Sequence, residues 1–258
     1  MLTTVEVGAV TAVTYSEVLF QFVSNIIGVP ISSVMFTELS EAGAKNDYYS
    51  VQNAISKTFN LIVLICIPIL IIILFYANSI VRIVYGHGNF SETAIEQTAV
   101  GLFFYSICII PVALKQVVTK AFYALNESKI PMLIGIFEVG MNIILSILWA
   151  KKGGVAGIVG ATAAASVTFV IILIIAFSKK YVVVFSNVQL GSYIKIFIAC
   201  LICVIGTFTL RDVVVVSDLF LDFCLKTVIS MVIYFGTLIL IKENTMRKIW
   251  RKKIEVDK

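Results

Sequence analysis

The chain has 258 residues, of which 60% are hydrophobic and 14% are charged, with a net charge of +5 and a mean hydropathy of +1.03. A soluble globular protein is roughly 45–50% apolar and roughly 25% charged, so this chain has too few polar groups to cover its apolar atoms in water. The composition therefore indicates a membrane protein and excludes a soluble enzyme, a nucleic-acid-binding protein and a disordered chain.

Seven apolar segments are long enough to cross a membrane as helices, each of which needs about 20 residues. In chain order they cover about residues 8–36, 51–77, 93–125, 130–150, 155–177, 192–210 and 219–241. These runs are far longer than the ~10-residue alternating strands of an outer-membrane barrel. We therefore expect an all-α, polytopic membrane bundle of about seven transmembrane helices.

Local signals interrupt or bound these segments. Gly28 and Pro30 interrupt the first one. In transporters a broken helix near the midplane exposes backbone groups to substrate or ions, although a simple proline kink is the favoured interpretation of this pattern alone. Near the start of the third segment, Ser91 and Thr93 are predicted helix caps, and Glu96 would complete a capping box on Thr93.

Positive charge is divided unequally between the two sides that seven spans would create. One side would hold 14 Lys and Arg residues and the other 5. Cytoplasmic loops carry the excess of Lys and Arg, which predicts a cytoplasmic C-terminus and an N-terminus outside. The richer side comprises Lys45, Lys57, Lys120, Lys129, Lys179, Lys180, Lys195, Lys242, Arg247, Lys248, Arg251, Lys252, Lys253 and Lys258, and the poorer side Arg82, Lys151, Lys152, Arg211 and Lys226.

The odd number of spans, with no basic leader before the first, indicates the C-terminal portion of a longer protein. The basic residues of the tail interleave with Ile249 and Trp250, which suits an anchor on the cytoplasmic leaflet.

Material for catalysis or metal binding is sparse. All five cysteines lie in apolar runs, and Cys200 and Cys203 form a C-x-x-C that has no second pair and no histidine nearby. We interpret the cysteines as small apolar residues of membrane helices. The sequence shows no nucleophile–base pair, metal cluster or phosphate loop, so we expect neither an enzyme nor a metal site.

Three ionisable residues stand out at membrane depth in the predicted spans, where such groups are costly and are functional candidates. They are Glu17, Lys115 and Glu138, and the last shares one helical face with Asn142 and Ser146 at four-residue spacing. We take these charges as candidates to line a substrate cavity. The alternatives are that they pair between helices to hold the bundle, or that Glu138 or Lys115 reaches the headgroups.

Three stretches of the chain carry a family resemblance. Residues 80–90 read Ile-Val-Arg-Ile-Val-Tyr-Gly-His-Gly-Asn-Phe, and residues 111–124 read Pro-Val-Ala-Leu-Lys-Gln-Val-Val-Thr-Lys-Ala-Phe-Tyr-Ala before a polar loop and Pro131. Together with the opening stretch Tyr15-Ser-Glu-Val-Leu-Phe-Gln and the later Gly28-Val-Pro-Ile-Ser, they resemble the MurJ/MviN family of lipid II flippases in the MOP exporter superfamily. The similarity runs from about residue 8 to about residue 177.

The resemblance implies an architecture. Members of the family have fourteen helices, of which twelve form two six-helix lobes, and this chain would be helices eight to fourteen. Residues 1–178 would then be five helices of a MATE/MOP-like second lobe, 179–241 two additional transmembrane helices, and 242–258 a basic cytoplasmic tail. The eighth helix of the family runs from outside to inside, which agrees with the charge distribution.

The resemblance also implies an activity and partners. The family moves an undecaprenyl-linked peptidoglycan precursor, lipid II, across the bacterial cytoplasmic membrane by alternating access and without chemistry. The partners would be membrane lipid, this precursor and the absent N-terminal lobe, in the same or a separate chain, and no nucleic acid. Two alternatives remain: an exporter of polysaccharide or teichoic-acid precursors, and a non-transporting remnant or scaffold.

The resemblance implies two sites. A cavity arginine of the family's eighth helix follows an Asn or Asp, and Glu17 and Val18 stand at that pair, so the arginine is missing here. Some members couple transport to sodium, and the corresponding ligands would be Asn142, Ser146, the carbonyl of Ile158, and Thr162. A carboxylate expected near Ser146 is absent.

Overall fold

The computed structural model describes residues 8–45, 47–88, 90–181, 187–213 and 216–242, and the predicted tail at 243–258 lies outside them. The described residues form helices joined by short links, without a strand. The helices are α1 (Ala9–Ala44), α2 (Tyr48–Tyr85), α3 (Glu92–Ser106), α4 (Ile109–Ala124), α5 (Lys129–Tyr181), α6 (Asn187–Val213) and α7 (Leu219–Leu240).

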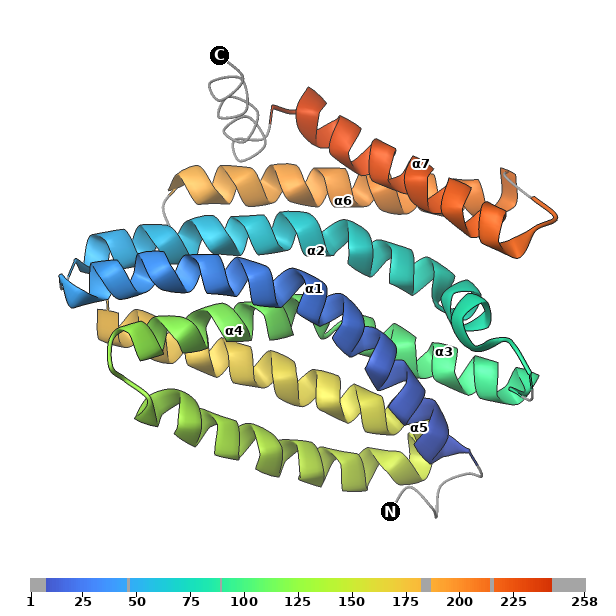
Figure 1. Ribbon diagram of the computed structural model, residues 1–258, viewed down its shortest axis with the longest axis horizontal. Coiled ribbons are helices and arrows are strands. Elements are labelled where there is room, and N and C mark those ends of the chain that lie inside the picture. The colour runs from blue at the N-terminus through green and yellow to red at the C-terminus, as the bar shows by residue number, and fades with distance from the viewer. Residues whose placement is uncertain (1–7, 46, 89, 182–186, 214–215, 243–258) are drawn as a thin grey trace.

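All seven predicted segments lie within these helices. The third corresponds to α3 and α4 together, which meet at an angle of 44° across Ile107 and Cys108. The fourth and fifth lie in α5, which turns back on itself as two antiparallel arms (Figure 1). The reversal occurs at Gly154, whose φ of 53° favours glycine. The predicted all-α polytopic bundle is confirmed.

The predicted interruption at Gly28 and Pro30 is not a break. α1 continues through both residues as one helix of 36 residues, and Figure 1 shows it bending along its length without ending. Proline removes one backbone hydrogen bond but keeps a helical φ, so the chain bends there and exposes no unwound segment.

Acidic and hydroxyl side chains cap the helix starts. Asp47 accepts a hydrogen bond from the backbone N–H of Ser50 at the start of α2, and a second bond from the Ser50 hydroxyl lowers the pKa of Asp47. Ser91 caps α3 by accepting from the N–H of Ala94. The predicted cap at Ser91 is confirmed. The predicted box on Thr93 is wrong, because the helix starts earlier and Thr93 lies inside its first turn.

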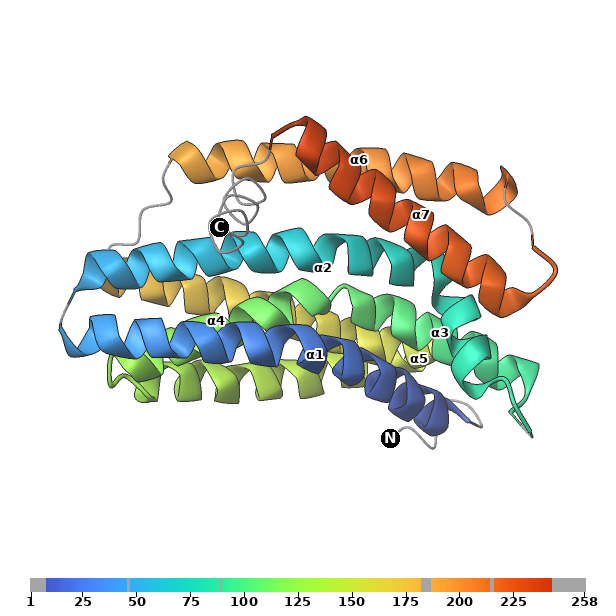
Figure 2. The same ribbon diagram turned by 45° about the horizontal axis from the view of Figure 1, so that its top comes forward.

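Two hydrophobic cores hold the bundle. The larger core is formed by residues of α1, α2, α3, α4 and α5. The smaller one joins α2, α6 and α7 through residues such as Ile71, Cys203 and Leu238. In both views α2 lies between the α6–α7 pair and the other helices (Figure 1, Figure 2). α2 is thus the wall that the two cores share.

Small residues set the closest helix approaches. Gly101 of α3 lies against Ser16 of α1, and a Cβ built on Gly101 would be 2.4 Å from the Ser16 hydroxyl oxygen. Both residues are buried, and Ser16 is held by a hydrogen bond to the carbonyl of Val13. Membrane helices use such positions to bring backbones together.

A charged group lies buried between α6 and α7. Lys226, which the charge pattern assigned to an outer loop, is only 6% exposed and lies 2.7 Å from a carboxylate oxygen of Asp222. One turn further, the hydroxyls of Ser230 and Thr207 are hydrogen-bonded across the two helices at 3.1 Å. The predicted segment 219–241 already contained Asp222 and Lys226, but counting Lys226 among the loop charges missed its burial.

Aromatic clusters mark both ends of the bundle. Tyr85, at the end of α2, stacks on Phe90 and contacts Tyr15. Tyr48, at the start of α2, stacks on Tyr181 at the end of α5. Because α2 runs the length of the bundle (Figure 1), the clusters lie at opposite ends, as aromatic belts do at the two membrane interfaces.

Candidate functional site

An ion pair links α4 to α5 in the middle of the bundle. The ammonium of Lys115 lies 2.5 Å from a carboxylate oxygen of Glu138, and the two side chains are 35% and 13% exposed. The Ser166 hydroxyl on the second arm of α5 donates to the other carboxylate oxygen at 3.4 Å. The ammonium also lies 4.3 Å from the centre of the Phe169 ring, a favourable cation–π distance. The structure thus joins two of the three predicted ionisable residues.

Glu17, the third, lies elsewhere. It is exposed on α1, and its carboxylate accepts a hydrogen bond from Gln21 on the next turn of the same helix at 2.9 Å. Thr14 and Asn25 are exposed on α1 as well. A stripe of exposed polar groups on a predicted membrane span suits water or protein better than lipid.

The predicted cation ligands form one hydrogen-bonded chain between the arms of α5. The Ser146 hydroxyl donates to the side-chain oxygen of Asn142 at 3.1 Å, and the Asn142 amide donates to Thr162 at 3.3 Å. Thr162 in turn donates to the carbonyl of Ile158 at 3.3 Å. The structure brings together all four residues that the resemblance implied.

These four groups fit part of a sodium site. They supply four neutral oxygens. Calcium, a hard cation that also prefers oxygen ligands, takes roughly six to eight. The neighbouring carboxylate, Glu138, is occupied by Lys115 and Ser166. A sodium ion bound here would need water or another residue to complete its coordination shell. Sodium binding by Asn142, Ser146, Ile158 and Thr162 stays a prediction.

A second cation on α4 was assigned to a loop by the sequence pattern. The Lys120 ammonium donates to the hydroxyls of Ser32 at 2.9 Å and Ser33 at 3.3 Å, both on α1. Gln116, one turn before Lys120, lies against Gly28, where a Cβ would be 3.0 Å from its side-chain oxygen. Gly28 therefore serves this close approach. The four-residue spacing of Gln116 and Lys120 was the available signal.

α4 thus carries polar groups on two sides. Lys115 faces α5, while Gln116 and Lys120 face α1, and α4 lies between these helices (Figure 1). Five residues separate the lysines along the helix, about 7.5 Å at 1.5 Å per residue. The two lysines therefore do not converge on one point, and the partly exposed Lys115 is the one that an anionic group could reach. Within the described part of the chain no group of three or more His, Cys, Asp or Glu is placed to bind a metal ion.

Comparison with known proteins gives one consistent family. The family model described as "Lipid II flippase MurJ" matches residues 1–234. The probable lipid II flippase MurJ of Treponema pallidum is 31% identical over 173 residues, which cover 67% of this chain and 33% of the relative. That of Thermotoga maritima is 26% identical over 178 residues, covering 67% and 36%. This chain therefore spans about a third of the length of these curated relatives.

A solved structure gives the same architecture. "Lipid II flippase MurJ, inward closed conformation" superposes with a TM-score of 0.77 and 22% identity, covering 91% of this chain and 47% of that one. At this identity the likeness shows the fold alone.

Proposed function

The chain belongs to the MurJ family of lipid II flippases, and we propose that it forms one wall of the path along which the lipid II headgroup crosses the bacterial cytoplasmic membrane. Residues 1–178 would supply five helices of the second lobe, and 179–241 two helices that flank it. The chain itself is a multi-pass membrane protein. A first lobe, in the same or a separate chain, would supply the opposite wall.

The observation that carries this proposal is the partly exposed ion pair of Lys115 and Glu138. A charged pair in mid-bundle is expensive unless it meets water or a polar ligand. A pair needed only to hold helices together would be shielded on all sides, yet a third of the Lys115 side chain is exposed. The polar exposed face of α1 supports the same interpretation.

The mechanism that we propose is competition for one cation. In the empty state Glu138 neutralises Lys115, so the ammonium is not left alone in a medium of low dielectric constant. A phosphate of the precursor would replace Glu138 as the partner of Lys115. The headgroup would then cross the membrane in contact with polar groups of the protein, while its polyprenyl chain stays in lipid. No bond is made or broken.

Complementation tests the proposal. The chain alone should not rescue cells depleted of their lipid II flippase, because alternating access needs two lobes that move about a shared site. Co-expression with a first lobe taken from a full-length relative should restore growth and accessibility of lipid II at the outer surface. Growth without such accessibility would favour export of another precursor. Rescue by the chain alone, measured as a monomer, would contradict the proposal.

The charge distribution supports an orientation, which we propose as C-terminus in the cytoplasm. A cysteine at Gly153, next to the reversal of α5, should react with an impermeant thiol reagent added outside, and one at Ser128 should not. Both positions are exposed, and nothing lies within 4 Å of a Cβ on Gly153. The native residues Cys66, Cys108, Cys200, Cys203 and Cys224 are first replaced by alanine. Labelling at Ser128 alone would reverse the orientation.

A further inference from the structure

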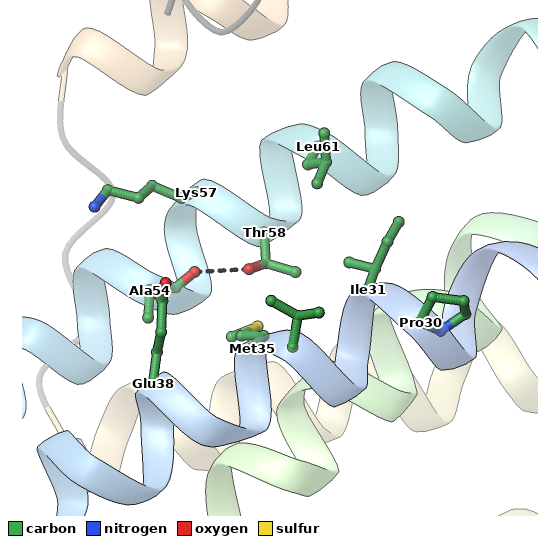
Figure 3. Close-up of a pocket in the computed structure, with 9 residues that line it drawn as sticks. Pro30, Ile31, Met35, Glu38, Ala54, Lys57, Thr58 and Leu61 are labelled. Carbon is green, nitrogen blue, oxygen red and sulfur yellow. Dashed lines mark hydrogen bonds between the residues drawn. The ribbon is translucent and has the colours of Figure 1, made fainter. Parts of the chain in front are cut away.

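A groove runs between α1 and α2 near the end of the bundle where these helices connect (Figure 3). Its volume is about 400 Å³. Neither the ion pair nor the polar chain of α5 contributes to it. The lining residues are Pro30, Ile31, Val34, Met35, Glu38, Ala54, Lys57, Thr58 and Leu61.

The body of the groove is apolar. Its hydroxyl group, that of Thr58, donates to the carbonyl of Ala54 at 2.9 Å (Figure 3) and therefore offers its methyl group to a ligand. From Pro30 to Glu38 the groove follows α1 over eight residues, about 12 Å at 1.5 Å per residue. A narrow apolar trough of this length suits a hydrocarbon chain, because a polar ligand would lose hydrogen bonds to water there.

Two opposite charges lie at one end of this trough. Glu38 points from α1 toward α2 beside Ala54, and Lys57 extends from α2 away from α1 (Figure 3). Both are exposed, and the structure gives neither one an ion pair or side-chain hydrogen bond to any described residue. By contrast, Glu41 and Lys45, one turn nearer the helix end, pair with each other at 2.8 Å.

We propose that this groove binds a phospholipid that carries a primary amine, such as phosphatidylethanolamine. Its ammonium group would donate to the Glu38 carboxylate, its phosphate would accept from the Lys57 ammonium, and one acyl chain would lie along Val34, Met35 and Leu61. The Glu38 carboxylate and the Lys57 ammonium are opposite in sign to the amine and the phosphate of such a headgroup. An anionic headgroup would be repelled by Glu38, and a trimethylated amine has no N–H to donate.

The depth of the site is that of a lipid headgroup. Tyr48 and Tyr181 stack at the same end of the bundle, and aromatic residues gather at the membrane interface. Glu38 lies six residues before the end of α1 at Ala44, about 9 Å from it. The inference needs only a membrane and does not rest on the proposed transport activity.

Native mass spectrometry of the full chain in detergent tests this. Phosphatidylethanolamine, phosphatidylcholine and phosphatidylglycerol with identical acyl chains are added in turn. We expect the ethanolamine lipid to be retained about fivefold more strongly than the choline lipid, the effect of one charge-assisted hydrogen bond at a partly exposed site. Glu38→Gln should abolish this preference. Val34→Trp, at a site 71% exposed, should reduce retention of every lipid by filling the trough.

Glu41→Gln is the matched control, since it removes an exposed carboxylate one turn away and should leave the preference unchanged. Equal retention of the three lipids would overturn the proposal, as would stronger retention of phosphatidylglycerol. A preference for ethanolamine that survives in Glu38→Gln would overturn it too. Glu38 and Glu41 are exposed, so their substitution should leave the core intact. A circular-dichroism melt of each variant checks this.

Discussion

Lys115→Met should abolish lipid II transport by the chain co-expressed with a first lobe. Lys115 is the ammonium that we propose to pass from Glu138 to the phosphate, and removing one member of a desolvated, hydrogen-bonded charge pair costs roughly 2–5 kcal/mol, more than tenfold in any step that needs it. The measurement is the rate at which lipid II becomes accessible at the outer surface. Lys115→Arg should keep part of the activity, since the charge persists with a different geometry.

A double variant separates transport from stability. Lys115→Met leaves Glu138 without its cation, which destabilises the folded protein unless the carboxyl group takes up a proton. Lys115→Met combined with Glu138→Gln removes both charges, so the protein should regain its normal membrane level and remain inactive. Lys45→Met, which removes an exposed lysine at the end of α1, should be active. Normal transport by the double variant would show that Lys115 and Glu138 only stabilise the fold, and would contradict their proposed role in transport.

Gly101→Leu should have the largest effect on stability. The added side chain would meet Ser16 at the contact of α3 with α1, where the first added carbon already lies 2.4 Å from the hydroxyl oxygen. Ser16 is fully buried and cannot move aside without disturbing α1. Overpacking a close contact typically costs 1–3 kcal/mol and occasionally more; we expect about 3 kcal/mol or more here, seen as a lower unfolding temperature in detergent.

Gly140→Leu is the control for this substitution. Gly140 lies in the first arm of α5, with nothing within 4 Å of a Cβ placed on it. The same exchange should therefore change the unfolding temperature little, and its added helix propensity favours the fold slightly. If both variants melted alike, close packing at Gly101 would not be what holds α1 and α3 together.

Hydropathy predicted the membrane spans because their signal is local. The 53-residue α5 shows both its strength and its limit: hydropathy separated the segments 130–150 and 155–177, but it did not indicate that the helix continues up to Gly154, where the chain reverses. At Pro30 the sequence left two interpretations open, a broken helix and a simple kink. The favoured kink is what the structure has, because α1 continues through Pro30 as one helix.

Charged residues of the candidate site could be predicted from the sequence in the middle of an apolar segment, where charges are rare. Near the helix ends, where charges are common, they could not be told from loop residues. Lys115 and Glu138 stood out because each lies far from any loop, and their pairing follows from the contact of α4 with α5. Lys120 and Lys226 lie within a few turns of a helix end, so counting assigned them to loops. Only the three-dimensional arrangement shows Lys120 bonded to α1 and Lys226 buried beside Asp222.

The position of α2 as a shared wall has a mechanical consequence. α6 and α7 pack on α2 and on each other, and the Tyr234 hydroxyl donates to the carbonyl of Leu64 in α2 at 3.1 Å. A tilt of α2 during a transport cycle would therefore tilt α6 and α7 with it. Their outer faces meet lipid, so each cycle would have to deform the surrounding bilayer. Such deformation costs fractions of a kcal/mol per Å of mismatch, and the turnover rate should then depend on bilayer thickness.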